Sequence, residues 1–413
     1  MHAVSDALFA GVYPLLPLVA EDLHLSYGEV GAVKALLGAS SAVFQVPAGM
    51  LAEVAGEHLL LAGGTAWVGA GLIGMAFAVA FVPLLLLAVV AGIGGNTQHP
   101  VANAAVARLY DDASRPTAIG TLNFAGDVGK VAAPFVGGIG AAIYGWRGGI
   151  SALGALGVVF AIIYAIVVPV RWPSRRWSSR SDGNERMPLP TDLSYTFGDG
   201  ISARTGRAQT PAPWHPASWG VAAVAPYAAL SLIGAIDAAA RGAALALLPF
   251  AFARAGMDAS EVGVAFAVLF GAGAAGKFLC GPLAARTGPA VTIISTEVVT
   301  ALGIIIIPMA PHDAILWAIL PFGFSLNGTS SVLYALVAPL AVPAQRARAY
   351  GLYYTITLLA TAGSPLVYGA AADVMGLRAA FVVLGVITLG IVPLAWWWRT
   401  AFSTDGVPVT STR

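Results

Sequence analysis

Long apolar runs alternate with short polar or glycine- and proline-rich breaks along nearly the whole 413-residue chain. A helix needs about 20 apolar residues to cross the hydrocarbon core of a membrane, and many of these runs approach or exceed that length. The pattern predicts twelve transmembrane helices, at residues 2–20, 27–53, 59–81, 84–108, 116–144, 148–170, 219–253, 260–285, 290–309, 313–340, 345–373 and 378–399. We therefore expect an all-α membrane protein. Two explanations fit the short first run: a short helix, or a true start upstream of Met1.

One long polar segment, residues 171–217, interrupts this pattern and is rich in arginine, serine and proline, which is typical of a flexible linker. It separates an N-terminal half (1–170) from a C-terminal half (218–400), each with six predicted helices, and a polar tail (401–413) follows. Arginines outnumber acids in the linker, so the positive-inside rule places it in the cytoplasm. Because each half crosses the membrane an even number of times, both termini are predicted to be cytoplasmic.

Composition excludes several classes of protein. Charged residues make up 10% of the chain and hydrophobic residues 58%, whereas soluble domains carry about 25% charged residues. A soluble enzyme and a disordered chain are therefore excluded, and the net charge of +1 favours no nucleic-acid partner. The single cysteine, Cys280, lies in an apolar run, so neither a disulfide framework nor a cysteine-based zinc site is expected. Because the sequence lacks a phosphate-binding-loop motif and a catalytic or metal-binding cluster, we expect no enzyme activity and no cofactor or metal.

The two halves repeat one another. A constant offset aligns several residues of the N-terminal half with identical residues of the C-terminal half: Pro17 with Pro249, Glu29 with Glu261, Gly49 with Gly281 and Gly56 with Gly288. The offset in these pairs is 232 residues, and an offset of 231 aligns Arg115 with Arg346, Pro134 with Pro365 and Arg147 with Arg378. The chain is therefore predicted to be a parallel repeat of two six-helix halves.

The loop after the eighth predicted helix, Gly281-Pro-Leu-Ala-Ala-Arg-Thr-Gly288, resembles the G-x-L-A-D-R-x-G motif of the major facilitator superfamily. Its counterpart, Gly49-Met-Leu-Ala-Glu-Val-Ala-Gly56, keeps the acid as Glu53 but lacks the arginine that the other copy has as Arg286. The resemblance covers the whole chain. It implies a monomer that works by alternating access about a midplane site. It also implies a conformational motif made of Gly49, Glu53, Gly281 and Arg286, in which the acid caps a neighbouring helix.

The N-terminal half is similar to a narrower group, the fosmidomycin-resistance-type exporters. The similarity lies in His2-x-x-x-Asp6, in Tyr13-Pro-Leu-Leu, in His99-Pro100 and in the run 123–130. It implies an efflux-type antiporter. Asp127 and Lys130 stand where that group has neutral residues, so the substrate is expected to differ from the group's.

Polar residues inside the predicted helices are the candidate site. A charged residue near the bilayer centre costs about 2.5–3.5 kcal/mol on insertion scales, so it is expected to face a cavity or a partner. The candidate substrate contacts are Lys34, Asn96, His99, Asn123, Lys130, Lys277, Asn327 and Tyr353, and the candidate proton-coupling residues are Asp6, Asp127 and His99. Asp127 and Lys130 share a helix face. Either they neutralise each other and only aid packing, or Asp127 binds a proton while Lys130 binds an anion.

Three further positions favour structural roles. Asp237 and Arg241 are spaced to satisfy each other on one helix, and Glu297 lies on a helix predicted to be peripheral. Lys34 is close enough to the outer surface for its ammonium to reach upward. The lysines and the arginine among these residues nevertheless favour an anionic substrate.

Together these observations predict a secondary active transporter of a small anionic organic solute. Proton coupling and efflux-type antiport in a bacterial inner membrane are expected, with the solute, protons and the lipid bilayer as partners. Two alternatives stay open. One is a proton-coupled or exchange importer of a small organic acid, and the other is a membrane scaffold or sensor that does not transport.

Overall fold

A computed structural model of the protein describes residues 1–44, 47–48, 51, 56–95, 101–102, 115–168, 219–342 and 345–402. Five predicted site residues fall outside this description: Gly49, Glu53, Asn96 and His99, together with the side chain of Asn123. The predicted linker, 171–217, also lies outside it, as does the tail from residue 403.

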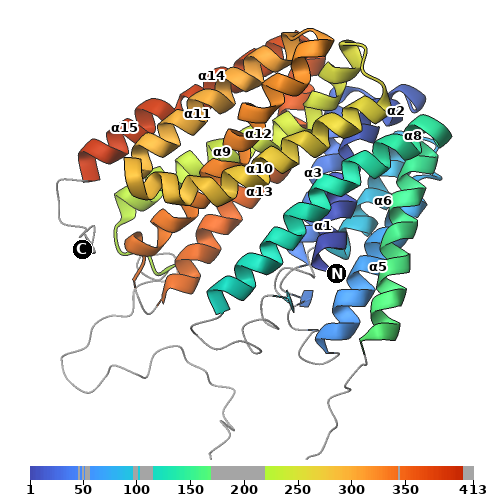
Figure 1. Cartoon of the computed structure of the whole chain (residues 1–413), viewed down its shortest axis with the longest axis horizontal. Helices are drawn as coiled ribbons and strands as arrows, with labels where there is room; N and C mark the ends of the chain where they lie inside the picture. Colours follow the sequence, from blue (N-terminus) through green and yellow to red (C-terminus); the bar gives the residue numbers. More distant parts are fainter. Residues whose placement is uncertain are drawn as a thin grey trace, which may run out of the picture.

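The N-terminal half is a bundle of helices (Figure 1). The first predicted helix is broken into α1 (His2–Ala10), the 3-10 turn η1 (Tyr13–Leu15) and α2 (Leu16–Asp22). Then come α3 (Tyr27–Val43), α5 (Glu57–Met75), α6 (Phe81–Ile93) and α8 (Arg115–Val167). The last of these contains two predicted spans, separated at Gly145, where φ is 66° and the chain turns in a conformation that glycine adopts without strain.

The C-terminal half repeats this arrangement with α9 (Val224–Arg254), α10 (Ala259–Thr287), α11 (Pro289–Ile306), α12 (His312–Val337) and α13 (Arg346–Met375). The last span is divided at Gly390 into α14 (Leu377–Leu389) and α15 (Ile391–Phe402). Each of the twelve predicted spans thus overlaps a helix or a broken helix in the described residues. The all-α prediction is confirmed.

The two halves also share the same capping interactions at the start of their second helix. Ser26 and Glu29 form a capping box at the start of α3, and Asp258 and Glu261 form one at the start of α10. In each box the first side chain accepts from the backbone N–H of the second residue, whose carboxylate accepts from the backbone N–H of the first. Free backbone groups at a helix start are thereby satisfied, so the same second helix begins at the same place in both halves.

The two halves pack tightly where α3 meets α13 and where α8 meets α10. Gly31 and Gly138 allow this approach: a Cβ at Gly31 would overlap the carbonyl of Pro365, and one at Gly138 would lie 3.0 Å from the Cα of Gly263. Small residues at helix crossings are the usual means of close packing in membranes. The two helix pairs therefore join the halves at these crossings.

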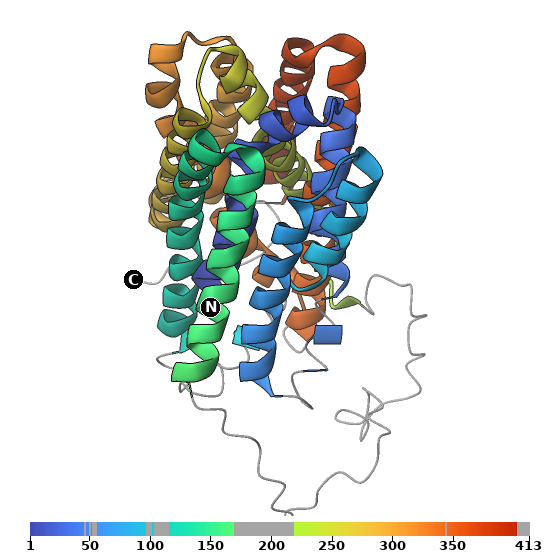
Figure 2. The ribbon, with the colours of Figure 1, turned by 90° about the vertical axis from the view of Figure 1, so that its right-hand side faces the viewer.

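Further contacts lie where α3 begins and α13 ends, at the end of the molecule away from the last turn of α8 (green in Figure 2), and we call this the closed end. The backbone N–H groups of Tyr27 and Gly28, at the start of α3, each donate to the carboxylate of Asp373 in α13 at 2.8 Å. Arg254 donates to the Tyr27 hydroxyl at 2.6 Å. The two halves are thus fastened together at the closed end.

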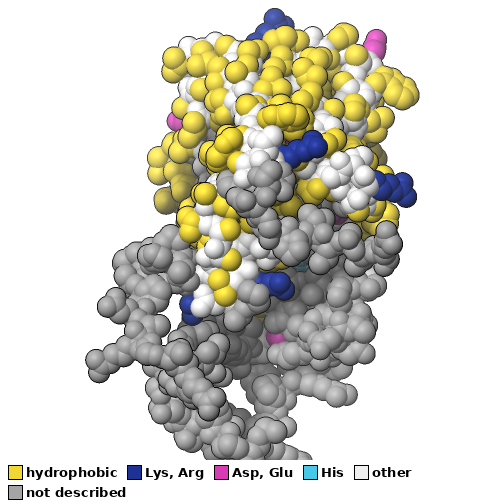
Figure 3. All heavy atoms as spheres, turned by 90° about the vertical axis from the view of Figure 1, so that its left-hand side faces the viewer, with side chains coloured by type: hydrophobic (Ala, Val, Ile, Leu, Met, Phe, Trp, Pro, Cys, Tyr) yellow, Lys and Arg dark blue, Asp and Glu magenta, His cyan; other side chains and the backbone are white. Residues whose placement is uncertain are grey.

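The outside of the bundle is apolar, as contact with lipid requires. Figure 3 shows one face on which hydrophobic side chains predominate among the described atoms. Large side chains stand exposed around the molecule, including Phe77, Phe278, Trp317 and Val374. Within the described ranges, nine helices are long and apolar enough to cross a membrane.

Candidate functional site

A cavity of about 420 Å³ lies between the two halves. This volume is within the range of small-molecule binding sites, about 300–1,000 Å³. Helices α1, α3 and α8 of one half and α9, α10, α12 and α13 of the other contribute its lining. Its charged and amide side chains are Asp6, Asp127, Lys130, Arg241, Lys277 and Asn327. The remaining wall is largely aromatic or small and apolar.

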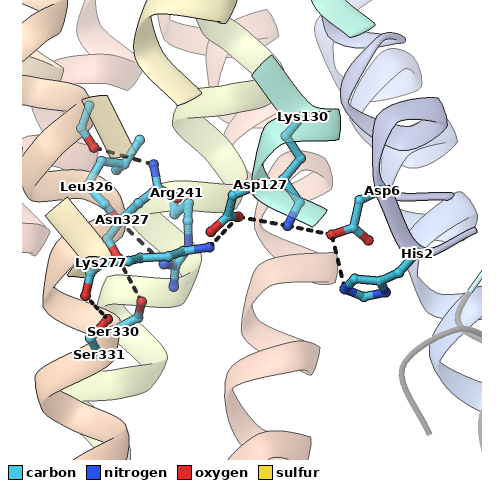
Figure 4. Close-up of polar contacts among 11 residues, drawn as sticks. His2, Asp6, Asp127, Lys130, Arg241, Lys277, Leu326, Asn327, Ser330 and Ser331 are labelled. Carbon is cyan, nitrogen blue, oxygen red and sulfur yellow. Dashed lines mark hydrogen bonds and ion pairs between the residues drawn. The ribbon is translucent and has the colours of Figure 1, made fainter. Parts of the chain in front are cut away.

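Four of these side chains form one continuous network, which we call the ionic chain: Lys277, Asp127, Lys130 and Asp6 (Figure 4). Lys277 Nζ lies 2.8 Å from Asp127 Oδ1, and Lys130 Nζ lies 3.3 Å from the same oxygen. Lys130 Nζ also lies 2.8 Å from Asp6 Oδ2. Because Lys277 belongs to the C-terminal half, the Lys277–Asp127 pair joins the two halves across the cavity.

Two glycines of α8 bring Asp6 to Lys130. A Cβ at Gly126 would lie 2.7 Å from Asp6 Oδ2, and a Cβ at Gly129 would overlap the backbone carbonyl of Ala3. Helix α1 can therefore lie against α8 only because these positions have no side chain. His2, one turn before Asp6, places its Nε2 3.9 Å from Asp6 Oδ2.

Arg241 of α9 supplies a third cation to the cavity. It donates to Asp237 Oδ2 at 2.8 Å and to the backbone carbonyl of Leu326 at 3.5 Å. Asp237 itself is buried behind the wall. The described lining itself has three cations, Lys130, Arg241 and Lys277, against two carboxylates, and the charge of Arg241 is balanced by Asp237 directly behind the wall.

Aromatic rings form much of the wall. Tyr13 stacks on Phe266 with ring centroids 5.6 Å apart, and Tyr334 stacks on Tyr354 at 5.3 Å. The Lys34 ammonium lies 4.0 Å from the Tyr13 ring centroid, a cation–π distance. Lys34 is buried, so it contacts the back of the wall instead of reaching the outer surface.

The structure separates the predicted site residues into two groups. Asp6, Asp127, Lys130, Lys277 and Asn327 meet at the cavity. Lys34 and Tyr353 are buried outside its lining, where Tyr353 packs edge-on against Tyr334. Gly281 and Arg286 lie at the far end of α10, and Arg286 is exposed.

The list of candidate contacts omitted one charged lining residue, Arg241. A structural pairing with Asp237 was favoured for it, whereas its side chain makes that pair and also faces the cavity. The signal that could have revealed it is the burial cost of an arginine in mid-helix, which favours a polar surface nearby.

Comparison with known proteins identifies the family. The sequence profile of the Major Facilitator Superfamily matches residues 1–235 and again residues 230–411. The chain belongs to this superfamily. It is thus a transporter and not an enzyme, and it is a multi-pass membrane protein. The prediction of the superfamily is confirmed, while the likeness to the fosmidomycin-resistance-type exporters stays a prediction.

A curated relative from Methanocaldococcus jannaschii, an uncharacterized MFS-type transporter, is 26% identical over 152 residues. That match spans 37% of this chain and 39% of the relative. Solved structures share the fold across nearly the whole chain. A bacterial homologue of the human lysosomal transporter Spinster, solved inward-facing and occupied, has a TM-score of 0.74 at 17% identity, covering 98% of this chain and 96% of the homologue. A variant of the nucleoside transporter NupG has a TM-score of 0.73 at 12% identity, covering 97% and 98%.

Proposed function

We propose that this major facilitator moves a small anionic organic solute by alternating access and that protons drive the transport. The observation that carries the proposal is that Lys130 and Lys277, one from each half, both contact Asp127 Oδ1 inside the cavity. Two ammonium groups around one carboxylate form an anion-binding site, and in this structure the bound anion is the side chain of Asp127 itself.

An incoming anion has to replace Asp127 as the partner of these lysines. A proton on Asp127 removes the charge that holds them, so protonation prepares the site for the anion. Linkage is reciprocal, and the bound anion therefore favours protonation of Asp127 to the same degree. The anion and the proton are thus expected to bind together.

Joint binding favours transport of both species in the same direction. This arrangement supports the proton-coupled importer of a small organic acid over the efflux-type antiporter that the fosmidomycin-resistance resemblance implies. Antiport requires that the proton and the substrate compete for the same site. In this ionic chain only a cationic substrate would compete with protons, because both would bind the carboxylates. Import is therefore the direction that we propose, and antiport is the second candidate because it rests on that resemblance.

The closed end is assigned to the outer side of the membrane. Arginines outnumber acids in the linker 171–217, so by the positive-inside rule we assign the linker and both termini to the cytoplasmic side of a bacterial inner membrane. We propose on this basis that the conformer is inward-facing, the conformation in which the Spinster homologue of similar fold was solved. Because one chain supplies all the described walls of the cavity, a monomer is the proposed functional unit.

The residues outside the description keep their proposed roles. His99, Asn96 and Asn123 are proposed to complete the substrate site, with His99 also exchanging protons. Glu53 and Gly49, with Gly281 and Arg286 in the other half, are proposed to stabilise one conformer through the loops that carry the superfamily motif.

A thermal-shift screen of detergent-purified protein tests this function. The panel holds phosphonates, phosphate esters, mono- and dicarboxylates and lipophilic cations, at about pH 5.5 and about pH 7.5; a ligand at a hundred times its Kd adds about 2.7 kcal/mol of apparent stability. We expect anions to stabilise the wild type. Lys277→Ala should abolish this stabilisation, and Arg378→Gln, which removes an exposed cation far from the cavity, should leave it intact.

The opposite pattern would overturn the proposal. Stabilisation by cations alone, unaffected by Lys277→Ala, would make the lysines structural and the carboxylates the substrate contacts. A stabilising anion found in the screen becomes the probe for flux measurements in liposomes.

A further inference from the structure

A second group of charged side chains lies in the C-terminal half, apart from the ionic chain. Asp237 and Arg241 come from α9 and Glu297 from α11, and we call these three residues the buried acid cluster. Asp237 is 2% exposed and Glu297 is 0% exposed. Arg241 is bonded to Asp237, and Glu297 is within electrostatic reach of both residues. Two buried carboxylates therefore lie near a single guanidinium.

The hydrogen bonds of the cluster are incomplete. Within the described structure, neither oxygen of Glu297 has a hydrogen-bond partner of good geometry, and Oδ1 of Asp237 lacks one as well. A buried carboxylate that is charged and unpaired costs several kcal/mol. With Arg241 already bonded to Asp237, a charged Glu297 would stand without compensation.

The surroundings supply no further positive charge among the described residues. Arg241 interacts electrostatically with Asp237, Glu297, Tyr334 and Tyr353, and the tyrosines are neutral. Lys277 of α10 is the next cation, and it is bound by Asp127. The charged residues of the neighbouring helices α13, α14 and α15 are exposed and lie near the helix ends, namely Arg346, Arg348, Asp373, Arg378 and Arg399.

We propose that Asp237 and Glu297 hold one proton between them and form a second proton site behind the cavity wall. A proton is the smallest cation that balances two carboxylates against one arginine, and it needs no more than the two acids. A metal ion would need several oxygen ligands arranged around it at once. The proton resides on Glu297, because Asp237 has the arginine.

Arg241 links this site to the cavity. Its side chain lines the cavity and also pairs with Asp237. An anion in the cavity that draws Arg241 toward itself leaves both acids without their cation, so a second proton enters the cluster. This link rests on the proposed transport of an anion, whereas the proton held at rest by Asp237 and Glu297 does not.

Infrared spectroscopy of the full chain in detergent tests the resting proton directly. A protonated carboxyl shows a C=O stretching band that a carboxylate lacks. We expect the wild type at about pH 7, where free carboxyls are ionised, to show this band. Glu297→Gln should remove it. Glu21→Gln, an exposed acid, and Asp127→Asn, in the ionic chain, should leave it unchanged. A band absent from the wild type, or unchanged in Glu297→Gln, would overturn the assignment.

Stability against pH gives a second readout. If unfolding releases the proton of the cluster, the unfolding equilibrium constant of the wild type should rise up to tenfold per pH unit above neutrality. Glu297→Gln carries an amide in place of the protonated acid, so this rise should vanish while it persists in Glu21→Gln. The same rise in Glu297→Gln would contradict the proposal. Stabilisation by sodium chloride but not by choline chloride, lost in Glu297→Gln, would assign the cluster to sodium instead.

These experiments separate the two claims. Asp127→Asn addresses the proposed transport and Glu297→Gln the buried proton. If no anion binds, the transport proposal fails and the infrared band should still be present. If the band is absent, the buried proton is refuted and the thermal-shift screen still decides the anion site.

Discussion

The ionic chain and the buried acid cluster both combine acidic and basic side chains at similar helical spacing, yet they differ in access to water. Asp6 and Asp127 expose 11% and 13% of their side chains, whereas Asp237 exposes 3% of its side chain and Glu297 is 0% exposed. In the cavity, water or a solute can replace one partner of an ion pair. In the cluster, each charge depends on the partner that the fold supplies. Solvent access therefore allows the ion pairs of the ionic chain to exchange partners, whereas the pair in the buried acid cluster must stay intact.

The two regions also differ in what they join. The ionic chain reaches from α1 through α8 to α10, so it spans both halves. The cluster lies within the C-terminal half alone. A movement between the halves can thus alter the ionic chain directly, and it can reach the cluster through Arg241.

The largest expected effect contrasts these regions by removing one charge from each. Arg241→Met leaves two buried acids without a cation, and breaking a buried pair costs about 3–5 kcal/mol. Asp127→Asn leaves Lys130 paired with Asp6 and leaves Lys277, with 35% of its side chain exposed, facing the cavity, so its cost should be smaller, on the order of 1 kcal/mol. Denaturant unfolding of both variants measures the difference.

The pH dependence of Arg241→Met sharpens this test. Glu297 already holds a proton in the proposed resting state, and a second proton neutralises the stranded Asp237, so the variant should regain stability as the pH falls, while Asp127→Asn should not. Equal losses in both variants at neutral pH would show that burial does not distinguish the two regions.

An intermediate effect is expected where α1 lies against α8. Gly129→Ala places a methyl group against the backbone carbonyl of Ala3, and overpacking of this kind costs about 1–3 kcal/mol. It should also separate Asp6 from Lys130 and weaken anion binding. Gly363→Ala is the matched control, because a Cβ there meets nothing within 4 Å and alanine favours the helix. A variant Gly129→Ala as stable as the control would contradict the close approach of α1 to α8.

The smallest effect is expected at the closed end. Asp373→Ala removes the acceptor for the first N–H groups of α3, and loss of such a cap costs about 1 kcal/mol. Because this contact joins the halves, the conformer open at that end should gain roughly fivefold in population. Spin labels at His24 and Asp313, on opposite halves, would report a longer distance.

Asp258→Ala provides the control for that measurement. It removes a cap of α10 within a single half, so it should reduce stability by a similar amount without lengthening the distance. The same lengthening in both variants would show that the contact of Asp373 does not hold the halves together.

The sequence predicted the helices and the repeat well because both depend on local composition. Apolar runs set the spans, and the capping residues Ser26 and Asp258 begin the second helix of each half. The common face of Asp127 and Lys130 also followed from their spacing. Such features depend on one helix at a time.

Contacts between distant helices could not be predicted in this way. Nothing along the chain pairs Lys277 with Asp127, or Glu297 with Asp237, since each pair requires the packing of helices far apart in the sequence. The same packing turns Lys34 onto Tyr13 and buries Tyr353 behind Tyr334. The close approach of α1 to the glycines at 126 and 129 likewise appears only in the folded structure.

Joint binding of anion and proton is the central claim, and the affinity for a stabilising anion measured against pH tests it most directly. The probe should keep its charge between about pH 5.5 and about pH 7.5, and the wild type should bind it more tightly at the lower pH, by up to tenfold per unit for one linked proton. Asp127→Asn, which mimics the protonated acid, should bind it tightly at both values. Tighter binding by the wild type at the higher pH, or an unchanged pH dependence in Asp127→Asn, would contradict the account.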